Sequence, residues 1–197
     1  MVQESGRKLE VDVTGEITVR RPAHVRVRLD RDGARKQLFY DGKLLTLLLE
    51  RENAYSQEEV PGAIDDMLAF VRDKMGTNLP LMDLLYSDVW SLLQKRVDFG
   101  FYVGENSVDG VPCHHLALSN ESVDAQIWVQ SAGPPVPRRM VLAFRALPGA
   151  PKRTARITNW DQVARHEDAY FAFSPPQGAE KITFVPQLPF PVAGEGR

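Results

Sequence analysis

Short stretches in which apolar and polar residues alternate run through the first sixty residues of the chain. Leu9, Val11 and Val13 begin the pattern, and residues 24–29 repeat it, with Val, Val and Leu alternating with His, Arg and Arg. A period of two is typical of a strand with one buried and one solvated face. Asp-Gly pairs separate the following apolar runs and supply hairpin turns. This region therefore predicts an antiparallel meander rather than alternating strands and helices.

The hydrophobic period lengthens after Pro61. Apolar residues recur there every three or four positions, which predicts two helices, over about 61–76 and about 80–95. Pro61 suits the first position of a helix, and Gly76 suits the position after its end. We expect no other helices.

Alternation returns at Val97 and continues to Pro175. The sequence predicts further strands over residues 97–103, 113–118, 125–130, 138–145, 152–160 and 170–173. We therefore expect an α+β fold in which about nine antiparallel strands form a single curved sheet, an open half-barrel, covered by the two mid-chain helices. Residues 1–185 form one domain in this interpretation, and the Pro- and Gly-rich residues 186–197 form a disordered tail.

Composition narrows the possible functions. The chain has 197 residues, 24 basic and 26 acidic side chains, and a net charge of −2, which argues against a nucleic-acid partner. Its single cysteine excludes an internal disulfide. No apolar run approaches the roughly 18 residues that cross a bilayer, so we expect no membrane-spanning segment.

A sheet that curves around two helices can enclose an apolar cavity between its layers. Methionines suit such a cavity because flexible thioethers adapt to variable acyl chains, although methionine also fills ordinary cores. The residues expected to line the cavity and bind a hydrophobic ligand are Met67, Leu68, Val71, Met75, Met82, Leu85, Phe99, Phe101, Leu142 and Phe144.

Several segments resemble a bacterial family of predicted periplasmic proteins of unknown function, in the order in which the family has them. They are Thr18-Val19-Arg20-Arg21-Pro22, Phe39-Tyr40-Asp41-Gly42-Lys43, Leu79-Pro80-Leu81-Met82-Asp83, Val108-Asp109-Gly110-Val111-Pro112-Cys113-His114-His115 and Phe173-Ser174-Pro175-Pro176-Gln177-Gly178. The resemblance extends from about Gly6 to Ile182.

That family is similar to the LolA-like superfamily of periplasmic lipoprotein carriers, which fold as half-barrels around a cavity for lipid chains. The resemblance implies that fold, a periplasmic location, and a lipid or lipoprotein acyl chain as ligand. It implies no catalytic residues and no cofactor, so we expect a binding or carrier protein rather than an enzyme. Because residues 1–7 carry no export signal, we also expect that a signal peptide precedes this sequence in the full protein.

Two alternatives remain open. The first is an interaction or envelope-sensor module that binds a protein partner through the basic first hairpins, where alternation places Arg26 and Arg28 on the solvated face. Those charges also suit protection of an edge strand against aggregation.

The second alternative is a metalloprotein or hydrolase that uses His114 or His115, with Cys113 as neighbour. Adjacent residues of a strand point to opposite faces, which argues against a shared metal site or a Cys–His pair. Other polar clusters are Asp65-Asp66, Asp124 and His166-Glu167-Asp168. We expect Asp65-Asp66 to be a solvated helix start and His166-Glu167-Asp168 to be a polar loop.

Overall fold

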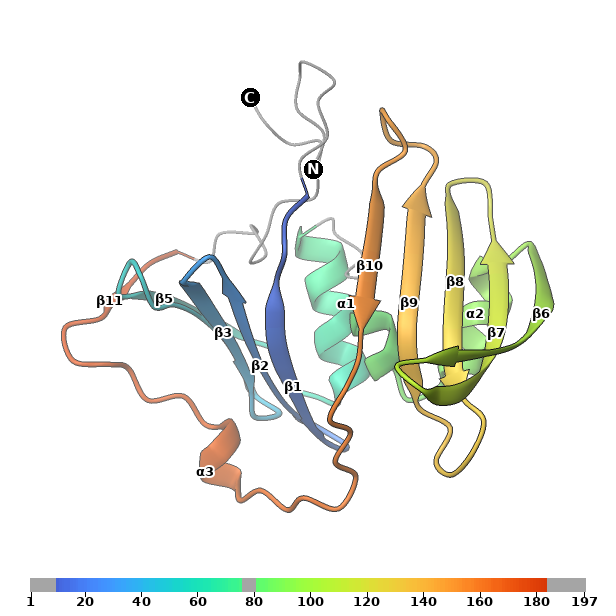
Figure 1. The fold of residues 1–197 in the computed structure, drawn as a ribbon. Coiled ribbons are helices and arrows are strands. Elements are labelled where there is room, and N and C mark those ends of the chain that lie inside the picture. Colours follow the sequence, from blue (N-terminus) through green and yellow to red (C-terminus); the bar gives the residue numbers. More distant parts are fainter. Residues whose placement is uncertain (1–9, 76–80, 184–197) are drawn as a thin grey trace. The chain divides into compact units, whose positions relative to one another are not determined.

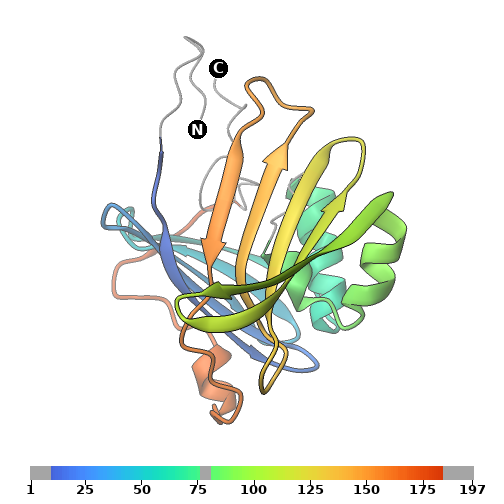
Figure 2. The ribbon, with the colours of Figure 1, turned by 45° about the vertical axis from the view of Figure 1, so that its right-hand side comes forward.

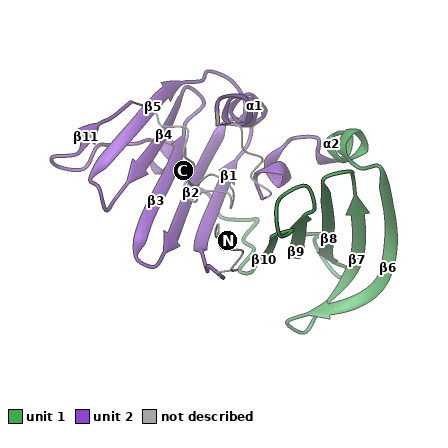
Figure 3. Ribbon diagram, turned by 90° about the horizontal axis from the view of Figure 1, so that it is seen from above, with its two compact units in different colours: residues 1–9, 90–164, 193–197 green, residues 10–89, 165–192 purple. Residues whose placement is uncertain are grey.

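The computed structural model describes residues 10–75 and 81–183 (Figure 1). The chain divides into two compact units, coloured separately in Figure 3. Residues 10–89 and 165–192 make up one of them, here called the N-terminal unit. The other, here called the middle unit, consists mainly of residues 90–164. The predicted tail, 186–197, lies outside the described residues.

Eleven strands are described, in two separate antiparallel sheets rather than the single sheet expected from the sequence. The sheet of the N-terminal unit has the order β1-β2-β3-β4-β5-β11, in which only the β5–β11 pair is parallel. The strands are β1 (Thr14–Arg20), β2 (His24–Arg31), β3 (Ala34–Tyr40), β4 (Leu44–Leu49), β5 (Ala54–Glu59) and β11 (Glu180–Lys181).

The sheet of the middle unit has the order β10-β9-β8-β7-β6. Its strands are β6 (Phe99–Val108), β7 (Val111–Ser119), β8 (Val123–Gln130), β9 (Pro137–Phe144) and β10 (Lys152–Arg156). Every strand in it pairs with its neighbour along the chain. The prediction of antiparallel strands was right, but one continuous sheet was wrong, because within the described chain the helical segment between β5 and β6 separates two complete meanders.

One face of the first sheet packs on the helix α1 (Ile64–Met75). Val25 and Val27 of β2 face Tyr40 and Leu38 of β3 across the ladder, as their alternation predicts. The helix supplies the other half of this core, whose buried members are Val25, Val27, Leu38, Tyr40, Leu45, Val60, Ile64, Met67, Leu68, Val71, Met82 and Leu85.

The first predicted helix is present, and it begins three residues after Pro61. The Asp66 carboxylate accepts a hydrogen bond from the Ala63 amide (2.8 Å), which satisfies a backbone donor at the helix start. The hydroxyl of buried Tyr40 donates towards the carbonyls of Val60 and Gly62 (3.0 and 2.7 Å), so it holds the chain that enters the helix against the sheet.

The second predicted helix is two short ones, the 3₁₀ turn η1 (Met82–Leu85) and α2 (Val89–Arg96). They are separated at Tyr86, whose backbone is extended (ψ 145°). Ser87 next to it donates its amide to Asp65 of α1 (2.9 Å), which fixes the break. Apolar spacing alone could not reveal the interruption, since the leucines keep their helical period across it.

The last predicted strand, 170–173, is wrong: Asp168–Phe171 form a single helical turn, α3. The strand predicted over 152–160 ends at Arg156. Both differences fall in the segment that leads from β10 to β11. Ile157 and Trp160 donate singly to carbonyls at the start of β9, and residues 166–173 contact the first sheet through individual side chains and carbonyls rather than a ladder.

The second sheet bends sharply along β6 (Figure 2). Its pairing with β7 shifts by one residue between Tyr102 and Gly104, and Gly104 has a φ of +140° that other residues rarely adopt. At the shared turn of these two strands, Asp109 pairs with Arg156 of β10. The β6–β7 hairpin therefore reaches across β8 and β9.

Candidate functional site

The second face of the first sheet is covered by residues 166–173, here called the docked segment. Phe171 is fully buried there, with its ring edge-on to His24 of β2 (5.3 Å between centroids). Phe173 packs beside the rings of Phe39 and Tyr55 (5.4 and 5.0 Å). Aromatic side chains thus attach a segment of little regular structure to a sheet that lies more than a hundred residues earlier in the chain.

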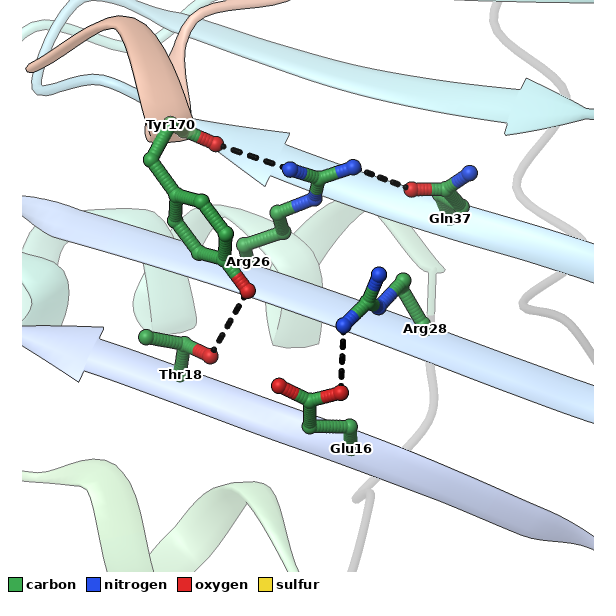
Figure 4. Close-up of polar contacts among 6 residues, drawn as sticks. All are labelled: Glu16, Thr18, Arg26, Arg28, Gln37 and Tyr170. Atoms are coloured by element: carbon green, nitrogen blue, oxygen red, sulfur yellow. Dashed lines mark hydrogen bonds and ion pairs between the residues drawn. The ribbon is translucent and has the colours of Figure 1, made fainter. Parts of the chain in front are cut away.

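Arginines of the first two strands hold the docked segment by its backbone and rings. The Arg26 guanidinium lies over the rings of Phe39 and Tyr170 (4.8 and 4.7 Å to the centroids). It donates to the Tyr170 carbonyl (3.2 Å) and to Gln37 (3.0 Å), as Figure 4 shows. Arg20 pairs with Asp168 and donates to the carbonyl of His166 (2.8 Å).

Arg28, drawn in Figure 4, pairs with Glu16 of β1. The Asp168 carboxyl is held in its charged form by Arg20, which lowers the pKa of that carboxyl. The basic face that the sequence places in solvent is thus partly occupied by the chain itself. A protein partner at these hairpins stays a prediction.

A small pocket lies between the docked segment and the sheet. Its volume is about 60 Å³, far below the roughly 300 Å³ at which small-molecule sites begin. The residues lining it are Phe39, Asp41, Leu44, Thr46, Gln57, Phe171, Ala172 and Phe173. An acyl chain does not fit in a pocket of this size.

Five of the ten predicted ligand-binding residues lie in the core under α1: Met67, Leu68, Val71, Met82 and Leu85. All of them are buried against the first sheet, where they fill the space between sheet and helix. Met75 ends α1, and its side chain lies outside the described residues.

The remaining four lie on the second sheet, and the strand register places them on opposite faces. Phe101 is paired with Ala117, then Gln126 and Val141 in turn across the sheet. Leu142 follows Val141 in β9 and so points to the other side, together with Phe144. The two pairs of predicted residues do not line one surface of this sheet.

Leu142 and Phe144 belong to an almost wholly apolar sheet face, here called the apolar face. Residues that pair across neighbouring strands form two adjacent rows on this face. One row is Leu116, Ile127, Met140 and Ala155, and the other is Leu118, Ala125 and Leu142. Met140 and Leu142 are buried, whereas the other members are only half-buried. The face comprises Leu116, Leu118, Val123, Ala125, Ile127, Met140, Leu142, Phe144 and Ala155.

Within the middle unit, α2 is the helix nearest this face. A side chain at Gly100 would meet Val97, which follows α2, and Leu118 of the apolar face, so the end of the helix lies on this side of the sheet. The side chain of Asn120 ties the helix end to the β7–β8 turn by donating to the Arg96 carbonyl (2.8 Å). None of the residues of α2 is buried, so the helix covers the sheet only loosely.

The opposite face carries a small core and a stack formed by His115, Trp128 and Arg139. Cys113 and Trp128 are buried there with Val108 of the bent hairpin. The Trp128 ring stacks on His115 (4.0 Å between centroids) and lies under the guanidinium of Arg139 (4.7 Å). Trp128, whose direction the sequence left open, thus belongs to this core and not to the apolar face.

Phe99 and Phe101 extend the same opposite face and are 63% and 52% exposed. Their rings contact each other, with centroids 5.8 Å apart. The prediction that these two rings contact a ligand remains untested, and it would place the ligand on this face rather than on the apolar face.

A comparison with protein families places residues 1–185 within the family described as predicted periplasmic protein (DUF2092). The chain belongs to this family. The match covers both compact units and agrees with the resemblance and the periplasmic location expected from the sequence. No curated protein matches the chain.

Members of this family are described as periplasmic, and among the described helices none combines the length and hydrophobicity needed to span a membrane. The family description specifies neither a ligand nor a reaction.

The histidine and cysteine candidates are dispersed by the sheet. His115 is buried, and the amide oxygen of Gln126 accepts a hydrogen bond from its Nε2 (3.0 Å), while exposed His114 points to the other side beside Tyr102 (3.1 Å). In residues 10–75 and 81–183, no three His, Cys, Asp or Glu side chains lie close enough together to hold a metal ion. Cys113 is fully buried in the small core.

Proposed function

We propose that the protein is a periplasmic, non-catalytic binding or carrier protein that holds the acyl chain of a lipid or lipoprotein on the apolar face of its second sheet. The observation that carries the proposal is the composition of that face, which is apolar along β7, β8 and β9 yet has mostly half-buried side chains. A contiguous apolar surface that the protein's own chain covers only in part commonly serves binding.

Desolvation of the ligand's acyl chain supplies the affinity in this proposal. Each methylene that leaves water contributes about 0.8 kcal/mol, so a long chain needs no specific polar contact to bind. The resemblance to half-barrel lipoprotein carriers favours the same ligand class. Loose cover by α2, none of whose residues is buried, suits a surface that must admit and release a chain.

Two matched substitutions on neighbouring strands test the proposal. Leu116→Gln adds a polar group to the apolar face, whereas Phe101→Gln makes a comparable change on the opposite face. In a titration with a fluorescent fatty-acid analogue, we expect Leu116→Gln to weaken binding roughly tenfold, the value of one buried leucine, and Phe101→Gln to leave it unchanged.

Native mass spectrometry of the purified wild-type protein with added lipid provides an independent readout. Absence of lipid binding by the wild-type protein in both measurements would refute the proposal. A loss of affinity confined to Phe101→Gln would move the site to the other face.

A further inference from the structure

Arg153 lies among the apolar side chains of the proposed binding face. In the β9–β10 register it is directly opposite Leu142, and so on the same side of the sheet. Its guanidinium carbon is 5.5 Å from the centre of the Phe144 ring, which confirms that the side chain runs over this face. Arg153 is half-buried.

No carboxylate of the described chain pairs with this arginine, unlike two other arginines of the same sheet. Arg156 on the same strand pairs with Asp109, and Arg145 at the end of β9 pairs with Asp124 (3.3 Å). For Arg153 the described part of the chain provides the Phe144 ring and no ion pair. Burial lowers the pKa of Arg153, and no neighbouring charge offsets that effect.

A partly buried cation without a counter-ion is costly, because the desolvation of the charge is not offset by an opposite charge. We infer that Arg153 binds the carboxylate headgroup of a single-chain lipid whose hydrocarbon chain lies on the apolar face. The planar guanidinium matches a carboxylate in geometry and charge. Apolar side chains along β7, β8 and β9 continue from this position and would contact the chain.

The inference rests on the proposed function and adds the class of ligand, a lipid with an anionic headgroup. Oleate and oleyl alcohol separate the two statements, because they share one hydrocarbon chain and differ in headgroup charge. Each is titrated against the full chain carrying the neutral fluorescent probe N-phenyl-1-naphthylamine, at a pH where oleate is ionised, and displacement gives the affinity.

We expect the wild-type protein to bind oleate at least about tenfold more tightly than oleyl alcohol, since a hydrogen bond to a charged group is worth that factor or more. Arg153→Gln should abolish the preference for oleate without lowering the affinity for oleyl alcohol. Arg153→Lys should retain part of it, because the charge remains while the planar guanidinium is lost.

Lys152→Gln is the matched control, since it removes one positive charge from the same strand on the opposite, exposed side. It should leave the preference intact, and far-UV circular dichroism checks that each variant folds. Equal affinities of the wild-type protein for both lipids, or a preference that survives Arg153→Gln, would overturn the headgroup inference alone. Failure of both lipids to displace the probe would overturn the proposed function as well.

Discussion

Removal of the Phe171 side chain tests whether the docked segment is an integral part of the N-terminal unit. Phe171 has no exposed surface, and its ring contacts His24, Tyr170 and the guanidinium of Arg20. A buried phenylalanine removes about 150–250 Å² from water, and at 25 cal/mol per Å² this corresponds to about 4–6 kcal/mol. Measured losses for Phe→Ala in cores are about 3–5 kcal/mol, so we expect Phe171→Ala to lower the free energy of unfolding by that amount.

Equilibrium urea denaturation followed by far-UV circular dichroism measures the effect. Tryptophan fluorescence is less suitable alone, because Trp90, Trp128 and Trp160 all belong to the middle unit. Val163→Ala serves as the control, since Val163 is 83% exposed and lies just before the docked segment; it should change stability by less than about 0.5 kcal/mol.

A loss below about 1 kcal/mol for Phe171→Ala would refute the reasoning, because it would mean that the segment contributes almost nothing to the fold. A loss equal to that of Val163→Ala would lead to the same conclusion. Increased proteolysis between residues 165 and 175 in Phe171→Ala, with little change in the urea midpoint, would show that the segment detaches by itself.

Two further predictions concern single residues that the fold positions closely. Tyr40→Phe should cost about 1–3 kcal/mol, since the carbonyls of buried Val60 and of Gly62 lose the hydroxyl that donates towards them. Burial raises the pKa of Tyr40 from 10.0 to about 12, so its contribution to stability is complete below pH 10 and is lost as the pH rises towards 12. Urea denaturation across this range should therefore show a fall in the free energy of unfolding that the Tyr40→Phe variant lacks. Gly104→Ala should destabilise the chain by about 1–3 kcal/mol in the same assay, because an alanine is strained at a backbone φ of +140°. Steric clash is not the cause, since a Cβ at this position would meet no atom within 4 Å. An unchanged stability would contradict this argument.

The strands of the sequence could be predicted because their alternation is strong and local. Val25 and Val27 point to the core, and the Asp-Gly pairs at 32–33 and 41–42 make the turns between strands. The division into two sheets could not be predicted in this way. Periodicity reports which face of a strand is buried but not which strands pair, and among the described strands β1–β5 do not pair with β6–β10.

The candidate site was predicted only in part, for a related reason. Leu142 and Phe144 lie on the apolar face, but Phe99 and Phe101 share an equally regular alternation and lie on the other side. The one-residue shift between Tyr102 and Gly104 also changes the phase of β6 along its length. Hydrophobic alternation marks two faces for each strand, and only the register tells which faces of neighbouring strands are the same.

The arginines of β2 show how a correct local prediction can miss the environment of a side chain. Alternation places Arg26 opposite the core, and the structure agrees, but Tyr170 covers it from a segment 144 residues later. Nothing near Arg26 in the sequence signals that contact. Arg153 is the converse case: its strand position suggests an ordinary surface charge, yet the register places it among apolar side chains without a carboxylate in the described chain. Two acceptors and two rings already contact the guanidinium of Arg26, whereas in the described chain Arg153 has the Phe144 ring alone, so the headgroup is assigned to Arg153.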